Sequence, residues 1–361
     1  MKLPDIAKKS ANFYAPRFEI EIEGQKLKGS MEKIITDLSI TEKIDEGASF
    51  TFTIYDEFDL KKQEFKWLEH ELFQVGNKIT IRLGYGSDLI TMIMGKITGI
   101  EPSFFAGEIP TITITGQDLS YDYIKRKSPE RTFTNMTYSE IAETIASEAK
   151  LKSVVDGTEI RISKKRKSNK ESYYQFLKKL AEEIGFVFFI NEQTMYFVKN
   201  YQRDKGKIVL EFGRDILSFK PSLRTTGIVT EVEVRGHNPN DPSRPIVGKA
   251  KAEGPLIKGE YLTIGSLRKK IDNPVKKVVD NIIVTSVTHA NSVARAILES
   301  SNESILEGEG SSIGTPQLRA GVNIRLEKIG KIFSGEYYVR ETTHTINNNG
   351  YITKFSVIRS G

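Results

Sequence analysis

Strict alternation of apolar and hydroxyl-bearing side chains is the feature that most constrains the fold of this chain. In "SFTFTIYD", Phe50, Phe52 and Ile54 alternate with serine and threonine, and "PTITITGQD" repeats the pattern. A period of two places the apolar side chains on one face of an extended strand, whereas a helix would scatter them around its circumference. Further alternating stretches, such as "RFEIEIEG" and "KITIRLGYG", precede residue 120. This part of the chain is therefore predicted to form a barrel or sandwich of about six strands.

The pattern changes to a helical period after residue 130. In "NMTYSEIAETIASEAKL", Thr137 precedes Glu140 by three residues, which is the signature of a capping box, and Ile141 and Ile145 follow at helical spacing. A second helix is predicted in "ESYYQFLKKLAEEIG", ending near Gly185, and a hairpin in "FVFFINEQTMYFV". These elements together predict a compact α+β segment.

Strands are predicted again in "KIVLEFG" and "GIVTEVEVRG". Residues 235–259 contain four prolines and four glycines, a composition that favours a long loop. One helix is predicted in "SVTHANSVARAILESSNESIL", with Ser286 or Thr288 as its N-cap. The last strands follow this helix.

Two alternating strands far apart in the sequence have similar surroundings. The first contains Ile79, Ile81 and Leu83, between Gly76 and Gly95; the second contains Val322, Ile324 and Leu326, between Gly321 and Gly335. The stretches "TITIT" and "YITKF" each begin 16 residues after the later glycine, at positions 111 and 351. This spacing predicts an internal repeat of an all-β unit, and chance similarity between two strand-rich segments is the alternative.

The composition excludes several classes of protein. The chain has no cysteine, which rules out disulfides, thiolate metal sites and cysteine nucleophiles. Its 53 basic and 47 acidic residues give a net charge of +6, far weaker than the concentrated basic stripe of a dedicated nucleic-acid-binding protein. The N-terminal residues lack the apolar core of a secretory signal, and no window reaches the roughly 18 apolar residues of a membrane span. We therefore expect a soluble protein of about two to four domains, made in the cytoplasm.

His344, in "TTHTI", and His70, in "KWLEHELF", are the histidines to weigh as reactive or metal-binding groups. A catalytic histidine needs a nucleophile or an orienting carboxylate within hydrogen-bond reach, and the sequence has no G-x-S-x-G motif. The residues around His70 do not have the H-E-x-x-H spacing of a zinc site. Both are therefore interpreted as structural or surface residues, with a chemical role as the alternative.

Basic runs such as "RISKKRKSNK" raise the question of nucleic-acid binding. Phosphate contacts use such clusters, but no aromatic side chains are interleaved with these runs for base stacking. Solvated loops or contacts with acidic proteins are the favoured interpretation, and nucleic-acid contact is the alternative.

Three blocks of sequence stand out in order along the chain. They are "WLEHELFQVGNKITIRLGYGS" with "MGKITGIEPSF" and "PTITITGQD", then "ESYYQFLKKLAEEIGFVFFINEQTMYFV", then "GTPQLRAGVNIRLEKIGKIFSGEYYVRETTHTINNNGYITKFSVIR". In this order they resemble the phage late control protein D family, the baseplate hubs of contractile-tailed phages and related injection systems, which is similar to the hub portion of VgrG proteins. The resemblance covers residues 14–359.

The resemblance implies a mainly β chain with two tube-like β-barrels, a connecting α+β domain and a helix-containing excursion. The expected parts are residues 14–125 for the first barrel, 126–205 for the α+β domain, 206–236 and 312–361 for the second barrel, and 237–311 for the excursion of loop and helix. It also implies a homotrimer whose six similar barrels form a ring around a channel. Such a ring would be a structural hub, without enzymatic activity or cofactor, that adapts a hexameric inner tube to a trimeric central spike.

The resemblance also implies partners and a place of assembly. The expected partners are a separate trimeric spike protein, a hexameric inner-tube or tube-initiator protein, and tape-measure and baseplate-wedge proteins; DNA or another cargo would only pass through, and no stable membrane insertion is expected. In VgrG-type chains the hub continues into the spike, whereas this chain stops at Gly361, so the spike is expected to be a separate polypeptide. Assembly is expected in the bacterial cytoplasm, as part of a phage tail, a tailocin or an injection-system baseplate.

No catalytic, cofactor-binding or metal-binding residue is predicted. The polar sides of the predicted barrel strands supply the candidates for a channel lining or a subunit interface: Thr80, Arg82, Thr111, Thr113, Arg325 and Lys354. Two other functions remain open. One is a tail-associated peptidoglycan hydrolase, which would need a carboxylate pair or a metal site. The other is an adhesin or nucleic-acid-binding tail component that uses the basic loops.

Overall fold

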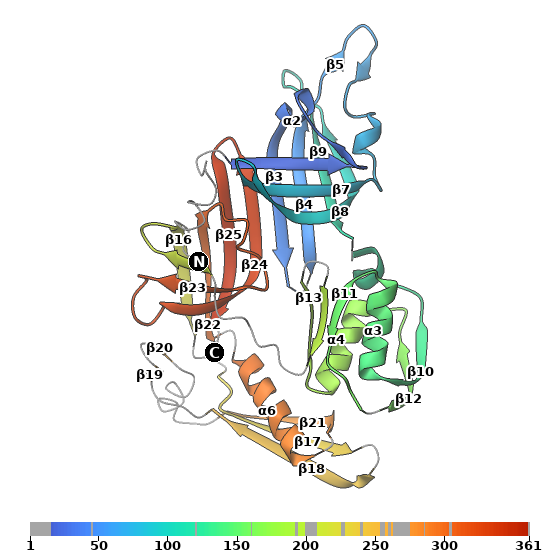
Figure 1. Ribbon diagram of the computed structural model, residues 1–361, viewed down its shortest axis with the longest axis vertical. Helices are drawn as coiled ribbons and strands as arrows, with labels where there is room; N and C mark the ends of the chain where they lie inside the picture. Colours follow the sequence, from blue (N-terminus) through green and yellow to red (C-terminus); the bar gives the residue numbers. More distant parts are fainter. Residues whose placement is uncertain are drawn as a thin grey trace.

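The computed structural model describes residues 16–44, 46–119, 121–159, 161–191, 194–198, 208–224, 228–238, 241–252, 257–258, 261–262, 275–284, 286–302 and 305–359. Strands dominate these residues, which confirms the predicted mainly β class. Thirteen strands from the N-terminal and C-terminal parts of the chain form one sheet, and smaller sheets lie beside it (Figure 1).

The first β unit begins the described chain and has its own hydrophobic core. Its elements are β1 (Pro16–Ile22), β2 (Gln25–Lys26), α2 (Ser30–Lys33), β3 (Ile35–Lys43), β4 (Gly47–Tyr55), β5 (Phe58–Asp59), β6 (Glu64–Phe65), the 3-10 turn η1 (Glu71–Phe73), β7 (Lys78–Tyr85), β8 (Asp88–Ser103) and β9 (Thr111–Asp118). Phe50, Phe52 and Ile54 are buried in this core, and Thr51 between them is exposed. The alternation in the sequence thus separates a core face from a polar face.

An α+β segment follows the first unit. It consists of the π-helical turn η2 (Tyr121–Lys125), β10 (Arg131–Thr137), α3 (Tyr138–Glu148), β11 (Lys152–Val155), β12 (Arg161–Lys167), α4 (Tyr173–Glu183), β13 (Val187–Asn191) and β14 (Thr194–Val198). The predicted capping box is present, because the hydroxyl of Thr137 accepts from the amide of Glu140 and the Glu140 carboxylate accepts from the amide of Thr137. Both helices contribute to one core, which contains Ile145 and Leu177.

The second β unit has a separate core, built from residues near the C-terminus. Its strands are β15 (Ile208–Glu211), β16 (Ile216–Leu223), β22 (Leu306–Ile313), β23 (Asn323–Glu327), β24 (Gly335–Asn347) and β25 (Gly350–Arg359). Leu210, Tyr337, Val339, Phe355 and Val357 are among the buried residues of this core.

Another α/β part lies between β16 and β22. It consists of β17 (Glu231–Asn238), β18 (Asp241–Lys251), the short pair β19 (Ile257–Lys258) and β20 (Tyr261–Leu262), β21 (Lys276–Ile283) and α6 (Val287–Ser301). The helix begins at one of the two predicted caps, because the amide of His289 donates to the hydroxyl of Ser286 at 3.1 Å.

The structure differs from two expectations in this part. The proline-rich stretch expected as a loop contains β18, which lies at the edge of the sheet β18-β17-β21, where a proline can face the open side without removing a ladder hydrogen bond. The boundaries expected at residues 236 and 312 also shift. β17 pairs with β18 and β21, whereas β22 pairs with β16 and β25 of the second β unit.

The two β units have the same strand order. Along the sheet, β1-β7-β8-β9-β4-β3 of the first unit corresponds to β15-β23-β24-β25-β22-β16 of the second, and the matched strands also occur in the same order along the chain. Their register shifts coincide as well: one lies between Ile97 and Gly99, and its counterpart lies between Val339 and Glu341. The internal repeat predicted from the sequence is therefore present, although β15 runs parallel to β23 and β1 antiparallel to β7.

The register of the repeat differs from the one that the sequence spacing predicts. Gly76 and Gly321 are equivalent, since each precedes its strand with a positive φ, of 97° and 90°. Strand pairing then matches Gly95 with Tyr337, and not with Gly335. A shift by two residues leaves every side chain on the same face, so the alternating pattern alone does not reveal it.

Figure 1 shows how these parts are arranged. The two β units lie side by side and are joined through β3 and β24, while the α+β segment and the α6 part lie at one end of them and the β5–β6 hairpin lies at the other. The pairing of the described strands does not close either unit into a barrel. Within the described ranges, no helix is both long and apolar enough to cross a membrane.

Candidate functional site: the seam between the two β units

The two β units meet along one seam, where β24 pairs antiparallel with β3. The register runs from Glu341 opposite Lys43 to Ile346 opposite Leu38. Strands from opposite ends of the chain therefore share one hydrogen-bonded ladder. This seam turns the two units into a single sheet with a fixed relative orientation.

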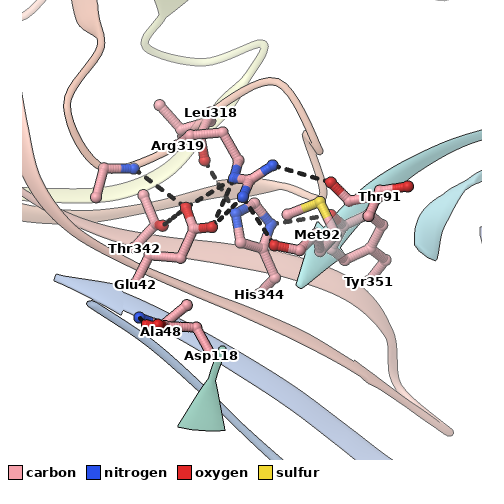
Figure 2. Close-up of polar contacts among 11 residues, drawn as sticks. Glu42, Ala48, Thr91, Met92, Asp118, Leu318, Arg319, Thr342, His344 and Tyr351 are labelled. Atoms are coloured by element: carbon pink, nitrogen blue, oxygen red, sulfur yellow. Dashed lines mark hydrogen bonds and ion pairs between the residues drawn. The ribbon is translucent and has the colours of Figure 1, made fainter. Parts of the chain in front are cut away.

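A buried ion pair crosses the seam. Glu42, on β3, and Arg319, in the loop before β23, are each 8% exposed. The Nε of Arg319 donates to both carboxylate oxygens of Glu42, at 2.8 and 2.7 Å, and its Nη2 also donates to Oε1. Figure 2 shows the guanidinium and the carboxylate facing each other. Direct pairing and hydrogen bonding are what allow two charges to remain buried.

The same arginine reaches another strand of the first unit. Its Nη2 donates to the carbonyl of Met92 at 2.8 Å and its Nη1 to the carbonyl of Thr91 at 3.3 Å, both on β8 (Figure 2). The hydroxyl of Tyr85, on β7, donates to the carbonyl of Gly314 at 2.8 Å. The loop of residues 314–322 is therefore held to β3, β7 and β8 of the other unit.

His344 lies in the middle of the seam and is completely buried. Its Nε2 is 2.9 Å from the carbonyl oxygen of Leu318, and its Nδ1 is 2.9 Å from the hydroxyl of Tyr351 and 3.1 Å from that of Thr353. Because a carbonyl can only accept, Nε2 carries the proton and Nδ1 accepts from a hydroxyl. The imidazole thus ties β24 to β25 and to the loop of residues 314–322.

The surroundings of His344 disfavour its charged form. Burial and the positive charge of Arg319 lower the pKa of His344 to about 3. Burial also raises the pKa of Tyr85 to about 12 and that of Tyr351 well above its ordinary value. At neutral pH the imidazole is therefore neutral and both phenols keep their protons.

This geometry is suited to holding the two units together and not to a reaction. His344 is 0% exposed and hydrogen-bonded through both ring nitrogens, so a substrate has no access to it. His70 has a local role, because its Nδ1 accepts from the amide of Leu72 at the start of η1. Nowhere in the described part of the chain do three or more histidine, aspartate or glutamate side chains gather in a way that could hold a metal ion. The contacts of His344 support its interpretation as a structural residue.

Hydroxyl-bearing side chains line the face of the central strands that is opposite to the cores. One row of directly opposed residues crosses seven strands of both units: Gln117, Ser49, Thr41, Thr343, Lys354, Ser311 and Ser218. Within it, the hydroxyls of Thr41 and Thr343 lie 3.1 Å apart across the seam, and those of Ser218 and Ser311 lie 2.7 Å apart. The seam therefore continues one polar surface from the first unit into the second.

The six residues predicted to line a channel or an interface fall into two groups. Thr111 and Thr113, on β9, and Lys354, on β25, lie on this polar face, where the hydroxyl of Thr113 is 3.4 Å from that of Thr53. Thr80 and Arg82 lie on β7 of the first unit, and Arg325 lies on β23 of the second unit. The structure does not bring the two groups together.

The two arginines of the second group have carboxylate partners on their own strand or on a neighbouring strand. Arg82 donates from Nη1 to Glu19 at 2.7 Å and to Glu21 at 3.1 Å, both on β1. The Nε of Arg325 lies 3.1 Å from a carboxylate oxygen of Glu327 on the same strand. These ion pairs occupy both side chains on the surface of the individual units.

Sequence reasoning missed the ion pair of the seam, although one of its members carries a signal. In "TDLSITEK", the alternation places Glu42 on the same face as the buried residues Leu38 and Ile40. A carboxylate at a core-facing position requires a buried partner, so its position could have indicated one. Nothing in the sequence near Arg319 identifies it as that partner.

The fold is similar to those of solved phage tail proteins. The 43 kDa tail protein of prophage MuSo2 from Shewanella oneidensis has a TM-score of 0.68 and 15% identity, over 96% of this chain and 98% of that one. A tail protein from Neisseria meningitidis MC58 has a TM-score of 0.66 and 13% identity, over 96% and 98%. The E. coli c3393 protein, described as a component of the type VI secretion system with structural similarity to T4 bacteriophage tail proteins gp27 and gp5, has a TM-score of 0.60 and 12% identity, over 95% and 77%. These likenesses show that the chain has a phage tail protein fold.

A comparison with curated proteins found no match. A family model matches residues 14–348, which is nearly the whole chain. Its description is the Alg8 N-terminal domain, and not late control protein D. The chain therefore belongs to the Alg8 N-terminal domain family.

Proposed function

We propose that this protein is the structural hub of a contractile tail or injection particle, a ring of copies that encloses a central channel. The ring would adapt a hexameric inner tube to a trimeric central spike and would catalyse no reaction. The observation that carries this proposal is the seam between the two β units. Each chain buries one such seam and leaves the equivalent edges open on β16 and on the part of β8 beyond Gly99.

One open surface belongs to the first unit. Among the described strands, β8 beyond Gly99 pairs only with β9, so the edge that corresponds to the buried edge of β24 is open. Val75 is 61% exposed, whereas its equivalent Ala320 is 6% exposed within the internal seam. Phe104 is 54% exposed, and its equivalent Ile346 is 7% exposed. The first unit thus exposes the apolar positions that the second unit buries.

The complementary open surface belongs to the second unit. Within the described part of the chain, β16 pairs only with β22, so the edge that corresponds to the buried edge of β3 is open. Ile332, in the β23–β24 hairpin, is 47% exposed, whereas the equivalent β7–β8 hairpin of the first unit contacts the seam through Tyr85 and Met92. Contact between β8 of one copy and β16 of the next would repeat the internal seam in trans.

A contact between two different surfaces can repeat from copy to copy. It forms a closed ring when the rotations between successive copies add up to a full turn. We take the number of copies from the resemblance to the late control protein D family, so the ring is a homotrimer with six similar units, and the two units of each chain serve as its tube-like barrels. In this ring the polar face, with Thr111, Thr113 and Lys354, lines the channel, while Thr80, Arg82 and Arg325 face neighbouring surfaces. The phage tail protein fold supports the proposal, and the name of the matched family designates a domain and not a reaction.

The partners belong to the same proposal. A separate trimeric spike protein and a hexameric inner-tube or tube-initiator protein bind the two ends of the ring, and tape-measure and baseplate-wedge proteins complete the particle. DNA or another cargo passes through the channel without stable binding. Assembly takes place in the bacterial cytoplasm, as part of a phage tail, a tailocin or an injection-system baseplate.

Engineered cysteine pairs test the ring directly, because the chain has no cysteine of its own. Thr41 and Thr343 oppose each other in the internal seam, and strand equivalence makes Ser222 and Glu101 the corresponding pair between copies. Such directly opposed positions have the short separation that a disulfide needs. Oxidised Glu101→Cys/Ser222→Cys protein is expected to give covalent trimers on a denaturing gel.

Two further pairs control this experiment. Thr41→Cys/Thr343→Cys should link within one chain and remain monomeric, and Ile100→Cys/Ser222→Cys places the two thiols on opposite faces and should not link. Covalent monomers from the internal pair without any oligomer from Glu101→Cys/Ser222→Cys, even in concentrated protein, would overturn the proposed ring.

A further inference from the structure

The open edges of the central sheet each carry a proline at an equivalent position. In the internal seam, His344 of β24 lies directly opposite Ile40 of β3. The matched register shifts make Pro102 of β8 the equivalent of His344 and Pro221 of β16 the equivalent of Ile40. A contact between copies that repeats the internal register therefore places the two prolines opposite each other.

His344 and Ile40 form a hydrogen-bonded pair in the internal ladder. The amide of Ile44 donates to the carbonyl of Arg340 at 3.1 Å, and every second pair along an antiparallel ladder is bonded in this way. His344 and Ile40 lie four residues from that pair, so their amides point across the seam. A proline at either position would remove one donor from the ladder.

The nitrogens of both prolines face the open edges. On β16, the amide of Arg224 donates to the carbonyl of Ile305 on the side of β22, so alternation turns Pro221, three residues earlier, toward the open side. Pro102 of β8 is the equivalent of His344, whose amide points across the seam from β24. The nitrogen of Pro102 therefore faces the open edge of β8. This placement explains how both strands keep their internal ladders despite the prolines.

The rest of the contact between copies also differs from the internal seam. Leu223 is equivalent to Glu42, and Gln74 is equivalent to Arg319, so the buried ion pair has no counterpart there. Replacing a buried ion pair by apolar contact is often neutral for stability, so this difference alone does not weaken the contact. The loss of both donors at the paired prolines does weaken it, because the carbonyl of each proline then faces the nitrogen of the other, which carries no hydrogen.

We propose that Pro102 and Pro221 set the strength of the contact between copies, an inference that rests on the proposed ring. The second copy is the partner of these edges, and the missing donors keep the copies separate in dilute solution. The ring then closes where a partner that binds several copies raises their local concentration. The same prolines deny a pairing site to foreign strands, the usual hazard of an open edge.

The test uses the full-length chain in sedimentation velocity over a range of concentrations. The wild type is expected to shift from monomer to oligomer as its concentration rises. Pro102→Thr/Pro221→Thr restores both donors and is expected to lower the midpoint concentration by about tenfold or more, the scale of one or two net hydrogen bonds. Pro245→Thr, on the edge strand β18 of a separate sheet, is the matched control and should leave the midpoint unchanged.

Two results would overturn this inference. One is a wild-type oligomer that resists dilution to the same extent as the oligomer of the double variant. The other is a double variant that folds but has the same midpoint concentration as the wild type. In either case, covalent trimers from Glu101→Cys/Ser222→Cys would leave the proposed ring intact. The absence of those trimers would instead remove the ring, and with it the contact that the prolines are proposed to tune.

Discussion

Arg319 holds both carboxylate oxygens of Glu42 across the seam between two β units, although 277 positions separate the residues in the sequence. The pair fixes more than one contact, because the same guanidinium also donates to two carbonyls of β8. A displacement of β24 along β3 would break all of these bonds together. The ion pair therefore stabilises the observed register of β24 against β3.

Removing one partner of this pair should strongly destabilise the chain. Glu42→Gln leaves the Arg319 cation buried without its counter-ion, and such a loss costs about 3–5 kcal/mol of the free energy of unfolding. Glu42→Leu/Arg319→Met removes both charges and is expected to cost much less. Urea unfolding followed by circular dichroism measures both. Arg82→Met, which breaks an ion pair at the surface, is the control and should cost about 1 kcal/mol or less; equal losses for Glu42→Gln and this control would contradict the prediction.

His344 should make the stability of the fold depend on pH below neutrality. Its pKa is about 3 in the folded chain, against about 6.5 for an unfolded histidine. Between these values the unfolded chain binds a proton that the folded chain does not, so stability is complete above about pH 6.5 and falls as the pH decreases, by up to about 1.4 kcal/mol per pH unit.

The measurement is the free energy of unfolding between about pH 7.5 and about pH 5.5, a range above the titration of ordinary carboxylates. His344→Gln should flatten this dependence even if it lowers stability at every pH. His70→Gln, at a partly exposed position, is the control and should retain the wild-type slope. A slope that His344→Gln leaves unchanged would show that another group is responsible.

Much of the local structure could be predicted from the sequence, because its signals are short-range. The alternation around Phe52 separated core from polar face, and the pair Thr137 and Glu140 fixed the start of α3. Gly76 and Gly321 marked equivalent turns before two strands of the repeat. Each of these features depends on neighbours within a few residues.

The seam could not be predicted in the same way, because its geometry depends on residues from opposite ends of the chain. Alternation fixed which face of β24 is buried but not that His344 lies opposite Ile40. The repeat itself was visible, yet Gly95 was matched with Gly335, two residues away from its structural equivalent Tyr337, and a period of two cannot distinguish such a shift. The equivalence of Pro102 and Pro221 became apparent only when strand pairing and register shifts were known.

Gly76 supplies a backbone conformation that other residues adopt only with strain. Its φ is 97°, and a Cβ added there would have no atom within 4 Å, so the backbone conformation and not a clash determines the effect of a substitution. Gly76→Ala is expected to cost about 1–2 kcal/mol in thermal or urea unfolding. Gly157→Ala also enters open space but lacks a positive φ, so it should be nearly neutral. Equal stability of the two variants would show that the turn before β7 relaxes without strain.

Most of the basic side chains in the run "RISKKRKSNK" have partners within the α+β segment. Three of its members pair with carboxylates, Arg161 with Glu140, Lys165 with Glu183 and Arg166 with Glu130. Lys167 is completely buried, and its Nζ donates to the carbonyls of Ser168 at 2.9 Å and Ser128 at 3.0 Å. The run therefore serves the packing of β12 and leaves few of its charges available for phosphates.

Lys167→Met should accordingly destabilise the α+β segment, because it leaves three carbonyls, those of Ser128, Pro129 and Ser168, without their buried donor. The expected loss is about 2 kcal/mol or more of the free energy of unfolding, since an unsatisfied buried polar group costs about 1–3 kcal/mol. Lys164→Met, at an exposed position on the same strand, removes the same charge and should change stability by less than about 0.5 kcal/mol. If instead Lys164→Met and Lys167→Met lose equal stability, the charge of the run matters more than the buried contacts, and its interpretation as a packing element is wrong.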